Sequence, residues 1–269
     1  RIAYAGRDAF PLTFPWIRLE ATVTIPSAFD LIVGADILDL LTDPEQEDGE
    51  KRFRVAYESS SRSLGLTIGT GYHRYTLDGP TSIEVAYLQG HEEEARFFAT
   101  LARDILEEYE GRYGAYPRTR LMIVENPNDV GLSFAADGIV WLSQRFFTHR
   151  NVLFFGALNR VAEYVLAHEI AHQWVGLGTG IDLNAEAWLS EGLAQYLAVR
   201  YFEGRYGAFE PNLFGFGSPG VIEELVKRQF GYFNLREHFI ELPYLMTQYV
   251  GFDEALVKPI ENVQFSNVS

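Results

Sequence analysis

Two histidines and a glutamate in one short segment carry the most evident chemistry in this sequence. The segment Val165–Trp174 reads Val-Leu-Ala-His-Glu-Ile-Ala-His-Gln-Trp. Residues four apart lie on the same face of a helix, so the imidazoles of His168 and His172 can bind one cation. Glu169 would lie beside that cation, where a carboxylate can accept a proton from water polarised by the metal. Zinc suits this chemistry, because it lowers the pKa of bound water from about 15.7 to roughly 7.

A third protein ligand is expected from the segment Ala187–Ala194, which contains Glu191. A catalytic zinc site has three protein ligands and keeps its fourth position open for water and substrate. Eighteen residues separate His172 from Glu191, and two helices joined by a loop of this size can lie antiparallel around one ion. We therefore predict that His168, His172 and Glu191 bind one Zn²⁺. Glu169 is the predicted catalytic base.

The alternative for the same residues is a core helix that binds no metal. The chain has six histidines among 269 residues, so a chance His-Glu-x-x-His has a probability on the order of 1%. Requiring a glutamate at one fixed later position lowers that probability about tenfold more. The spacing therefore favours the zinc site.

Two predicted helices, at about 158–174 and 185–206, would position these side chains. Another helix is predicted over 91–113, where apolar residues recur at helical spacing. Short apolar runs at 121–125 and 138–142 predict strands between these helices. The second half of the chain therefore combines helices with a small sheet.

The first ninety residues have the composition of strands and turns. Strands are predicted over residues 19–26, 29–34, 53–57, 64–69 and 81–87. The pattern changes near Gly90, so we predict an α+β protein with one domain over 1–90 and a second over 91–269.

Composition and charge exclude several classes of protein. Hydrophobic residues make up 47% of the chain, which is enough for a buried core. The 22 basic and 37 acidic residues give a net charge of −15, which argues against nucleic acid as a partner. There is no cysteine, so disulfides and thiolate metal sites are excluded. No stretch of roughly 18 uncharged apolar residues occurs, so we predict no membrane span within this segment.

The zinc-site residues resemble the M1 family of gluzincin metallopeptidases, which includes the aminopeptidase N relatives. The family hallmark is His-Glu-x-x-His-x-Trp, followed by a Trp-Leu-x-Glu-Gly-x-Ala segment with eighteen residues between the second histidine and the glutamate. Trp174 and the segment Trp188–Ala194 stand in those places. Tyr113–Pro117 looks like the Phe-Gly-x-Tyr-Pro segment that opens the family's catalytic domain.

The resemblance implies a β saddle domain packed against a thermolysin-like, mainly helical catalytic domain with a small sheet. We expect residues 1–90 to be the end of the saddle domain. Residues 91–269 would be a catalytic domain that is incomplete at its C-terminus. The implied activity is zinc-dependent hydrolysis of peptide or protein substrates.

The sequence departs from the family pattern at two positions. A family strand preceding Gly138 carries a glutamate that binds the free α-amine of the substrate, and Ala135 stands at that position here. Asp137, two residues later, could substitute with a shorter reach. The family's transition-state tyrosine lies in a Tyr-x-Lys-Gly motif, whereas Tyr249 is followed by Val-Gly without the lysine. We therefore expect a changed preference for free N-termini and a tyrosine located beyond Ser269.

Two other functions are compatible with the same residues. One is a catalytically impaired zinc protein that serves as a binding or scaffold module. Retention of Glu169 argues against it, because a structural site has no use for a carboxylate that is not a ligand. The other is hydrolysis of a small molecule that is not a peptide, which would leave peptides uncleaved.

Overall fold

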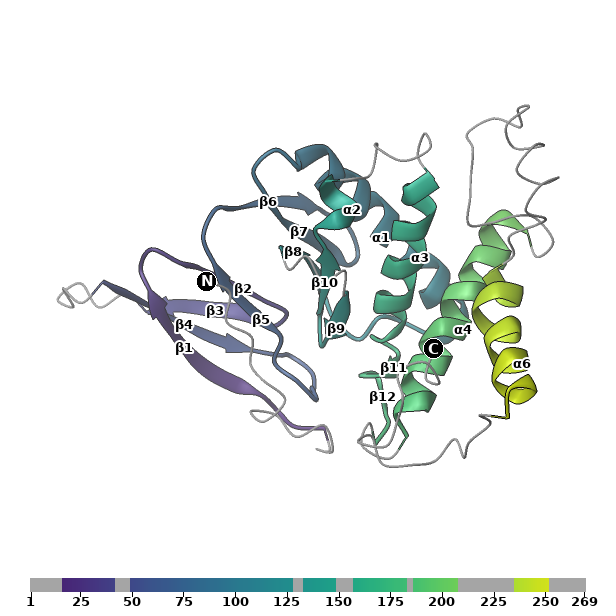
Figure 1. The fold of residues 1–269 in the computed structure, drawn as a ribbon. Helices are drawn as coiled ribbons and strands as arrows, with labels where there is room; N and C mark the ends of the chain where they lie inside the picture. Colours follow the sequence, from purple (N-terminus) through teal and green to yellow (C-terminus); the bar gives the residue numbers. More distant parts are fainter. Residues whose placement is uncertain are drawn as a thin grey trace.

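The computed structural model describes residues 16–41, 49–127, 133–148, 157–182, 186–207 and 235–251. These residues form a mixed α+β fold with several sheets and helices (Figure 1), which confirms the predicted class at this level. No helix among the described residues combines the length and the apolar character that a membrane span needs.

The strands nearest the N-terminus form two small antiparallel sheets. They are β1 (Glu20–Pro26), β2 (Asp30–Val33), β3 (Asp36–Leu41), β4 (Glu50–Ala56) and β5 (Leu66–Gly69). One sheet has the order β1-β4-β3, and the other pairs β2 with β5. Leu31 and Val33 pack into the core between these strands. Ile32 faces the opposite way and joins the core of a larger sheet, as the twofold alternation of a strand requires.

The larger sheet has five strands in the order β6-β7-β8-β10-β9. Their bounds are β6 Tyr72–Leu77, β7 Ser82–Leu88, β8 Arg120–Asn126, β9 Phe134–Ala136 and β10 Ile139–Ser143. The three central strands β7, β8 and β10 are parallel, and both edge strands are antiparallel to their neighbours. β9 pairs with β10 on one side only, so its outer edge faces no other described strand.

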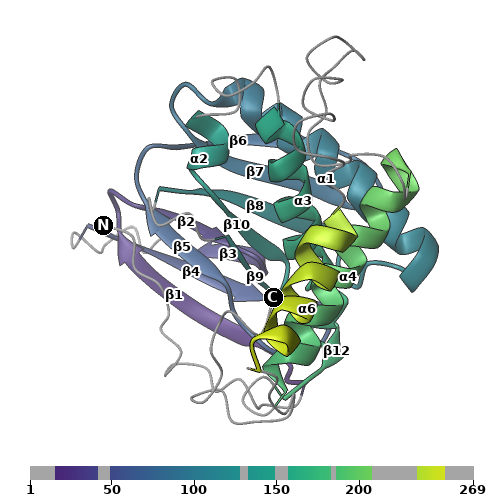
Figure 2. The ribbon, with the colours of Figure 1, turned by 45° about the vertical axis from the view of Figure 1, so that its right-hand side comes forward.

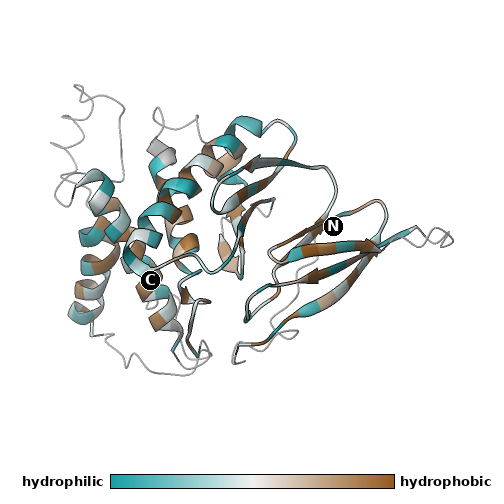
Figure 3. Cartoon of the chain, turned by 180° about the vertical axis from the view of Figure 1, so that it is seen from behind, coloured by the Kyte–Doolittle hydropathy of each residue, from teal (hydrophilic) through white to brown (hydrophobic). Residues whose placement is uncertain are grey.

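Helices cover one face of this sheet and the N-terminal strands cover the other. The helices are α1 (Glu92–Tyr113), α3 (Ala157–Ala171) and α4 (Ala187–Tyr206), which lie together on one side of the sheet (Figure 2). Leu121 and Ile123 pack against them, whereas Met122 and Val124 pack with Ile32 on the opposite face. Hydrophilic and hydrophobic residues are interspersed along the helices (Figure 3), whereas β8 is apolar from Leu121 to Val124 and buried on both faces. The core therefore lies on both sides of β8.

The remaining described elements are short. They are α2 (Arg145–Thr148), the strand pair β11 (Val175–Gly176) and β12 (Thr179–Gly180), the π-helical turn η3 (Glu237–Glu241) and α6 (Leu242–Tyr249). No strand was predicted at β3 or β6, whereas the family resemblance implied a strand just before Gly138, where β9 lies. β6 and β7 precede residue 90, yet they belong to the same sheet as β8. The division of domains at residue 90 stays a prediction, and the sheet draws strands from both sides of it.

We predict that Gly34→Ala destabilises the fold by about 1–3 kcal/mol, the usual cost of forcing extra atoms into a packed core. A methyl group at Gly34 would lie 2.2 Å from the carbonyl oxygen of Asp137. The control is Gly111→Ala in α1, where an added Cβ would meet no described atom outside the helix's own backbone within 4 Å and alanine should stabilise the helix by about 0.5–1 kcal/mol. Urea unfolding of both variants measures the difference. Equal stabilities would contradict the close contact at Gly34.

Candidate metal centre

The structure brings together the three residues predicted as metal ligands. Nε2 of His168 lies 3.3 Å from Nε2 of His172, and Oε2 of Glu191 lies 3.4 and 3.6 Å from these two nitrogens. A tetrahedral zinc centre with bond lengths of about 2.0–2.1 Å places its ligand atoms roughly 3.3–3.4 Å apart. The three donors therefore have the spacing of three corners of such a centre and fit zinc.

Two aromatic residues fix the position of α3, which carries both histidines. The Tyr109 hydroxyl, from α1, donates a hydrogen bond to the carbonyl oxygen of Ala167 at 3.0 Å. Trp174, just past the end of α3, donates from Nε1 to the carbonyl oxygen of Gly114 at 2.9 Å. The rings of Tyr109 and Trp174 also pack edge to face. Both contacts hold the histidine-bearing turns of α3 against α1.

Small residues let α4 approach α3 closely enough to bring in the third ligand. Glu191, Ala194 and Ala198 are spaced i, i+3 and i+7, so they share one face of α4. Ala194 and Ala198 are fully buried, as are Ala167 and Ala171 of α3. A glutamate on this face therefore points toward the histidines of the facing helix.

The ring of His172 is also oriented from its other nitrogen. The Ser190 hydroxyl oxygen lies 3.4 Å from Nδ1 of His172, where it can accept a weak hydrogen bond. Gly176 makes room for this contact, because a Cβ there would lie 2.2 Å from the Ser190 oxygen. Its φ of +87° also favours glycine. Nδ1 of His168 is buried and has no hydrogen-bond partner among the described residues. The contact of Ser190 with His172 was not predicted, since a serine on a helix carries no distinctive sequence pattern.

The electrostatics of the cluster favour a cation. Burial alone raises the pKa of Glu191, but its hydrogen bonds with the two histidines hold that pKa well below the usual range. Burial by itself lowers the pKa of His172. The hydrogen bond with Glu191 and the charge of Glu169 outweigh the effect of burial, so the pKa of His172 is raised overall. The cluster therefore stabilises positive charge at the point where the three donors meet.

Glu169, the predicted base, is 6% exposed and lines the same cleft as the three candidate ligands. Burial raises the pKa of its carboxyl group, and the positive charge of His168 and His172 offsets this only in part. A carboxylate with a raised pKa is a stronger base and accepts a proton more readily. Its position and environment suit proton transfer.

The cleft at the centre has a volume of about 180 Å³. Ser133, Phe134 and Ala135, at the edge strand β9, form the wall opposite the histidines. Ala135 thus lines the cleft at the position where the family resemblance implies an amine-binding glutamate. Among the described residues that line the cleft, only Glu169 and Glu191 carry carboxylates.

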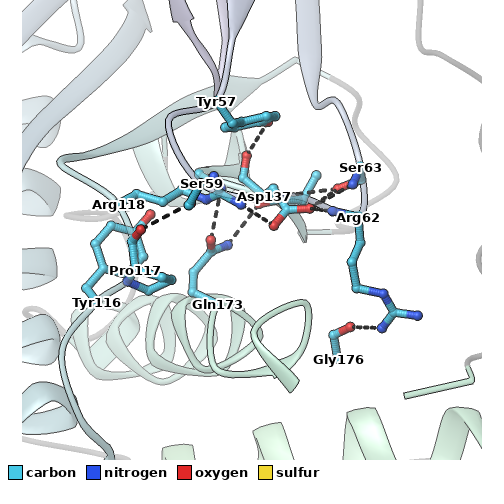
Figure 4. A network of polar contacts seen from close by, with 12 residues as sticks. Tyr57, Ser59, Arg62, Ser63, Tyr116, Pro117, Arg118, Asp137, Gln173 and Gly176 are labelled. Atoms are coloured by element: carbon cyan, nitrogen blue, oxygen red, sulfur yellow. Dashed lines mark hydrogen bonds and ion pairs between the residues drawn. The ribbon is translucent and has the colours of Figure 1, made fainter. Parts of the chain in front are cut away.

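Asp137 is not available to replace that missing glutamate. It lies 3% exposed in the turn between β9 and β10, and both of its carboxylate oxygens are engaged (Figure 4). One oxygen pairs with Arg118 at 2.5 Å. The other accepts hydrogen bonds from the Ser63 hydroxyl and from the backbone N–H groups of Arg62 and Ser63. The structure therefore gives no support to a substitution by Asp137, because its carboxylate is already engaged and it does not line the cleft.

Tyr249, the nearest approach to the expected transition-state tyrosine, is 89% exposed at the end of α6. It does not line the cleft at the candidate metal centre. Residues 252–269 lie outside the described part of the chain. A tyrosine beyond Ser269 stays a prediction.

Residues 99–230 match the profile of the peptidase family M1 domain. This segment contains both histidines, Glu169 and Glu191. Residues 99–230 belong to peptidase family M1. The M1 segment covers part of the chain, and it includes α1 from residue 99 onward, the central strands β8 and β10, and both helices of the metal centre.

Several curated aminopeptidases are similar to the chain that carries this M1 segment. Aminopeptidase N of Lactobacillus delbrueckii subsp. lactis is 25% identical over 212 residues, which are 76% of this chain and 25% of that protein. Human aminopeptidase O is 40% identical over 85 residues, 31% of this chain and 9% of that protein. Probable aminopeptidase 2 of Sulfurisphaera tokodaii is 24% identical over 185 residues, 67% of this chain and 23% of that protein.

The alignments thus span a quarter or less of these three relatives. The family and the relatives support a peptidase-like hydrolase function for the M1 segment.

We predict that zinc stabilises the chain against heat and that a chelator reverses this. At a free zinc concentration 100 times the Kd, binding to the native state alone contributes about 2.7 kcal/mol. His172→Ala should abolish most of the zinc-dependent rise in Tm, because it removes one of three ligands. His73→Ala on the edge strand β6 is the matched control and should keep the full rise. An unchanged zinc response in His172→Ala would contradict the proposed ligand set.

Proposed function

We propose that this chain is part of a zinc-dependent metallopeptidase that hydrolyses peptide bonds. The observation that carries the proposal is the meeting of His168, His172 and Glu191 at separations of 3.3–3.6 Å, with the buried Glu169 in the same cleft. The M1 match over 99–230 supports a peptidase and suggests peptide substrates.

The residues of the centre have distinct roles in this proposal. His168, His172 and Glu191 would hold the zinc ion. When bound, zinc supplies Lewis acidity, which acidifies water and polarises a substrate carbonyl. Glu169 accepts the proton that the attacking water loses and then delivers it to the nitrogen of the leaving amine. The raised pKa of Glu169 suits both steps, because the group must take up a proton and later release it.

The edge strand β9 would position the substrate. Its outer edge faces no other described strand, so an extended peptide can pair with it by backbone hydrogen bonds. Such pairing would bring the peptide along Phe134–Ala136, beside the histidines. Ala135 offers no charge to a free α-amine, so we propose a reduced preference for free N-termini.

The architecture that we propose follows the same resemblance. Residues 1–90 would be the C-terminal part of a β saddle domain. Residues 91–269 would belong to a thermolysin-like catalytic domain. The two small antiparallel sheets fall within residues 1–90, whereas the five-stranded sheet takes β6 and β7 from that part and β8, β9 and β10 from the other.

We predict that Glu169→Gln lowers kcat for peptide hydrolysis by about 10²–10⁴-fold, the usual contribution of a general base. Zinc content should stay the same, because Glu169 is not a ligand in this proposal. Turnover of fluorogenic peptides and metal analysis of the same preparations measure both effects. Zinc-loaded wild type that cleaves no peptide would contradict the proposal. That outcome would favour the scaffold or the small-molecule hydrolase.

We predict that Ala135→Glu restores a preference for free N-termini. A carboxylate at this position can bind an α-ammonium group, and such charged hydrogen bonds contribute about 1.5–3 kcal/mol. The ratio of kcat/KM for a free-amine peptide to that for its acetylated form should rise roughly 10–100-fold. Ala135→Gln has the same shape without the charge and is the matched control. An equal rise in both variants would show that charge at this position does not select the amine.

A further inference from the structure

The turn between β9 and β10 is held by a polar network that reaches three distant parts of the chain (Figure 4). The network joins residues 57–63 of the connection between β4 and β5, residues 116–118 before β8, and residues 173–176 after the histidine helix α3. All of these segments meet at Asp137 and its two neighbours in sequence. The turn is therefore fixed by tertiary contacts as well as by its own hairpin.

The carboxylate of Asp137 ties the turn to the N-terminal strands. Both oxygens are used by Arg118, Ser63 and the Arg62 backbone, as described above. The backbone of Asp137 takes part as well. Its carbonyl accepts a hydrogen bond of 2.7 Å from the Tyr57 hydroxyl, and its N–H donates to the Ser63 hydroxyl at 3.1 Å. Burial first, and then the charge of Asp137, raises the pKa of Tyr57, so this hydroxyl keeps the proton that it donates.

Gln173 holds the same turn from the side of the metal centre. It follows His172 directly and is 2% exposed. Its amide nitrogen donates to the carbonyl oxygen of Ala136 at 2.9 Å, and its amide oxygen accepts from the N–H of Gly138 at 3.0 Å. One side chain thus binds the residues on either side of Asp137. Any movement of the turn relative to His172 would break at least one of these bonds.

Arg62 completes the connection between the N-terminal strands and the centre. Its guanidinium donates to the carbonyl oxygen of Gly176 at 2.7 Å and to that of Ile181 at 2.9 Å. Gly176 lines the cleft and contacts Ser190, the neighbour of His172. Residues 62 and 63 therefore contact both the turn that follows β9 and the segment that follows α3.

We propose that Asp137 and Gln173 are positioning residues that set the distance between the edge strand β9 and the metal centre. β9 has three residues and one strand partner among the described strands, so its own pairing constrains it weakly. The polar network acts on the end of β9 that leads into the turn. This inference rests on the proposed function, since the strand matters for catalysis only if β9 aligns a peptide with the zinc centre.

The positioning role has a consequence that a purely structural role lacks. An error of about 1 Å in the placement of a substrate can lower a rate by about 100-fold. Loosening the turn should therefore lower kcat/KM for peptides and leave zinc affinity intact, because the ligands lie on α3 and α4. A purely structural network would lower the Tm with no effect on kcat/KM well below that temperature.

The test is Asp137→Asn in the zinc-loaded chain, with Glu203→Gln as the matched control. Glu203 lies on α4, and its carboxylate pairs with the guanidinium of Arg236 at 2.6 Å. Neither residue lines the cleft. We expect amide exchange in 133–141 to quicken at least tenfold in Asp137→Asn, with 120–126 of β8 unchanged. We expect kcat/KM to fall by about 100-fold at unchanged zinc affinity. The control should lower the Tm and change neither quantity.

Unchanged exchange in 133–141, or unchanged kcat/KM together with faster exchange, would overturn the positioning role. If Asp137→Asn does not fold, Gln173→Met removes the two bonds on the other side of the turn and is judged by the same criteria. Exchange is measured without turnover. A chain that cleaves no peptide but shows the predicted change in exchange would therefore refute the proposed function and leave the control of β9 by this network supported.

Discussion

The close contact between α3 and α4 is the constraint on which the candidate centre depends. The fully buried alanines on the facing sides of the two helices leave no room for larger side chains. Glu191 on α4 reaches Nε2 of His168 and His172 because the helix backbones lie so near each other. A bulky residue at Ala194 or Ala198 would separate the helices and remove the third donor, with both histidines still in place.

A second constraint comes from outside the helices. The cleft has two walls, the helix α3 and the edge strand β9, and they are far apart in the sequence. Asp137 and Gln173 join them through a buried network that begins in the N-terminal strands. The N-terminal sheets therefore do more than cover one face of the larger sheet, since they also fix the turn that ends β9. This arrangement gives them a part in the geometry of the site.

The sequence predicted the elements that have strong local patterns. The spacing of His168, His172 and Glu191 identified residues that the structure brings together, because helical periodicity and a short connection constrain them locally. β9 was expected from the family resemblance alone, since three residues carry no alternation of their own, and β6 was not predicted, because it is an edge strand with no fully buried residue. The role of Asp137 could not be predicted either, because its partner Ser63 lies 74 residues away.

X-ray absorption at the zinc K-edge of the metal-loaded chain tests the central claim most directly. It reports the number and type of atoms bound to the metal and needs no substrate. We predict one zinc ion per chain with four nitrogen or oxygen ligands at about 2.0–2.1 Å, and outer-shell scattering from two imidazoles. A six-coordinate shell, or a shell without two imidazoles, would contradict the assignment of His168, His172 and Glu191 as a catalytic zinc centre.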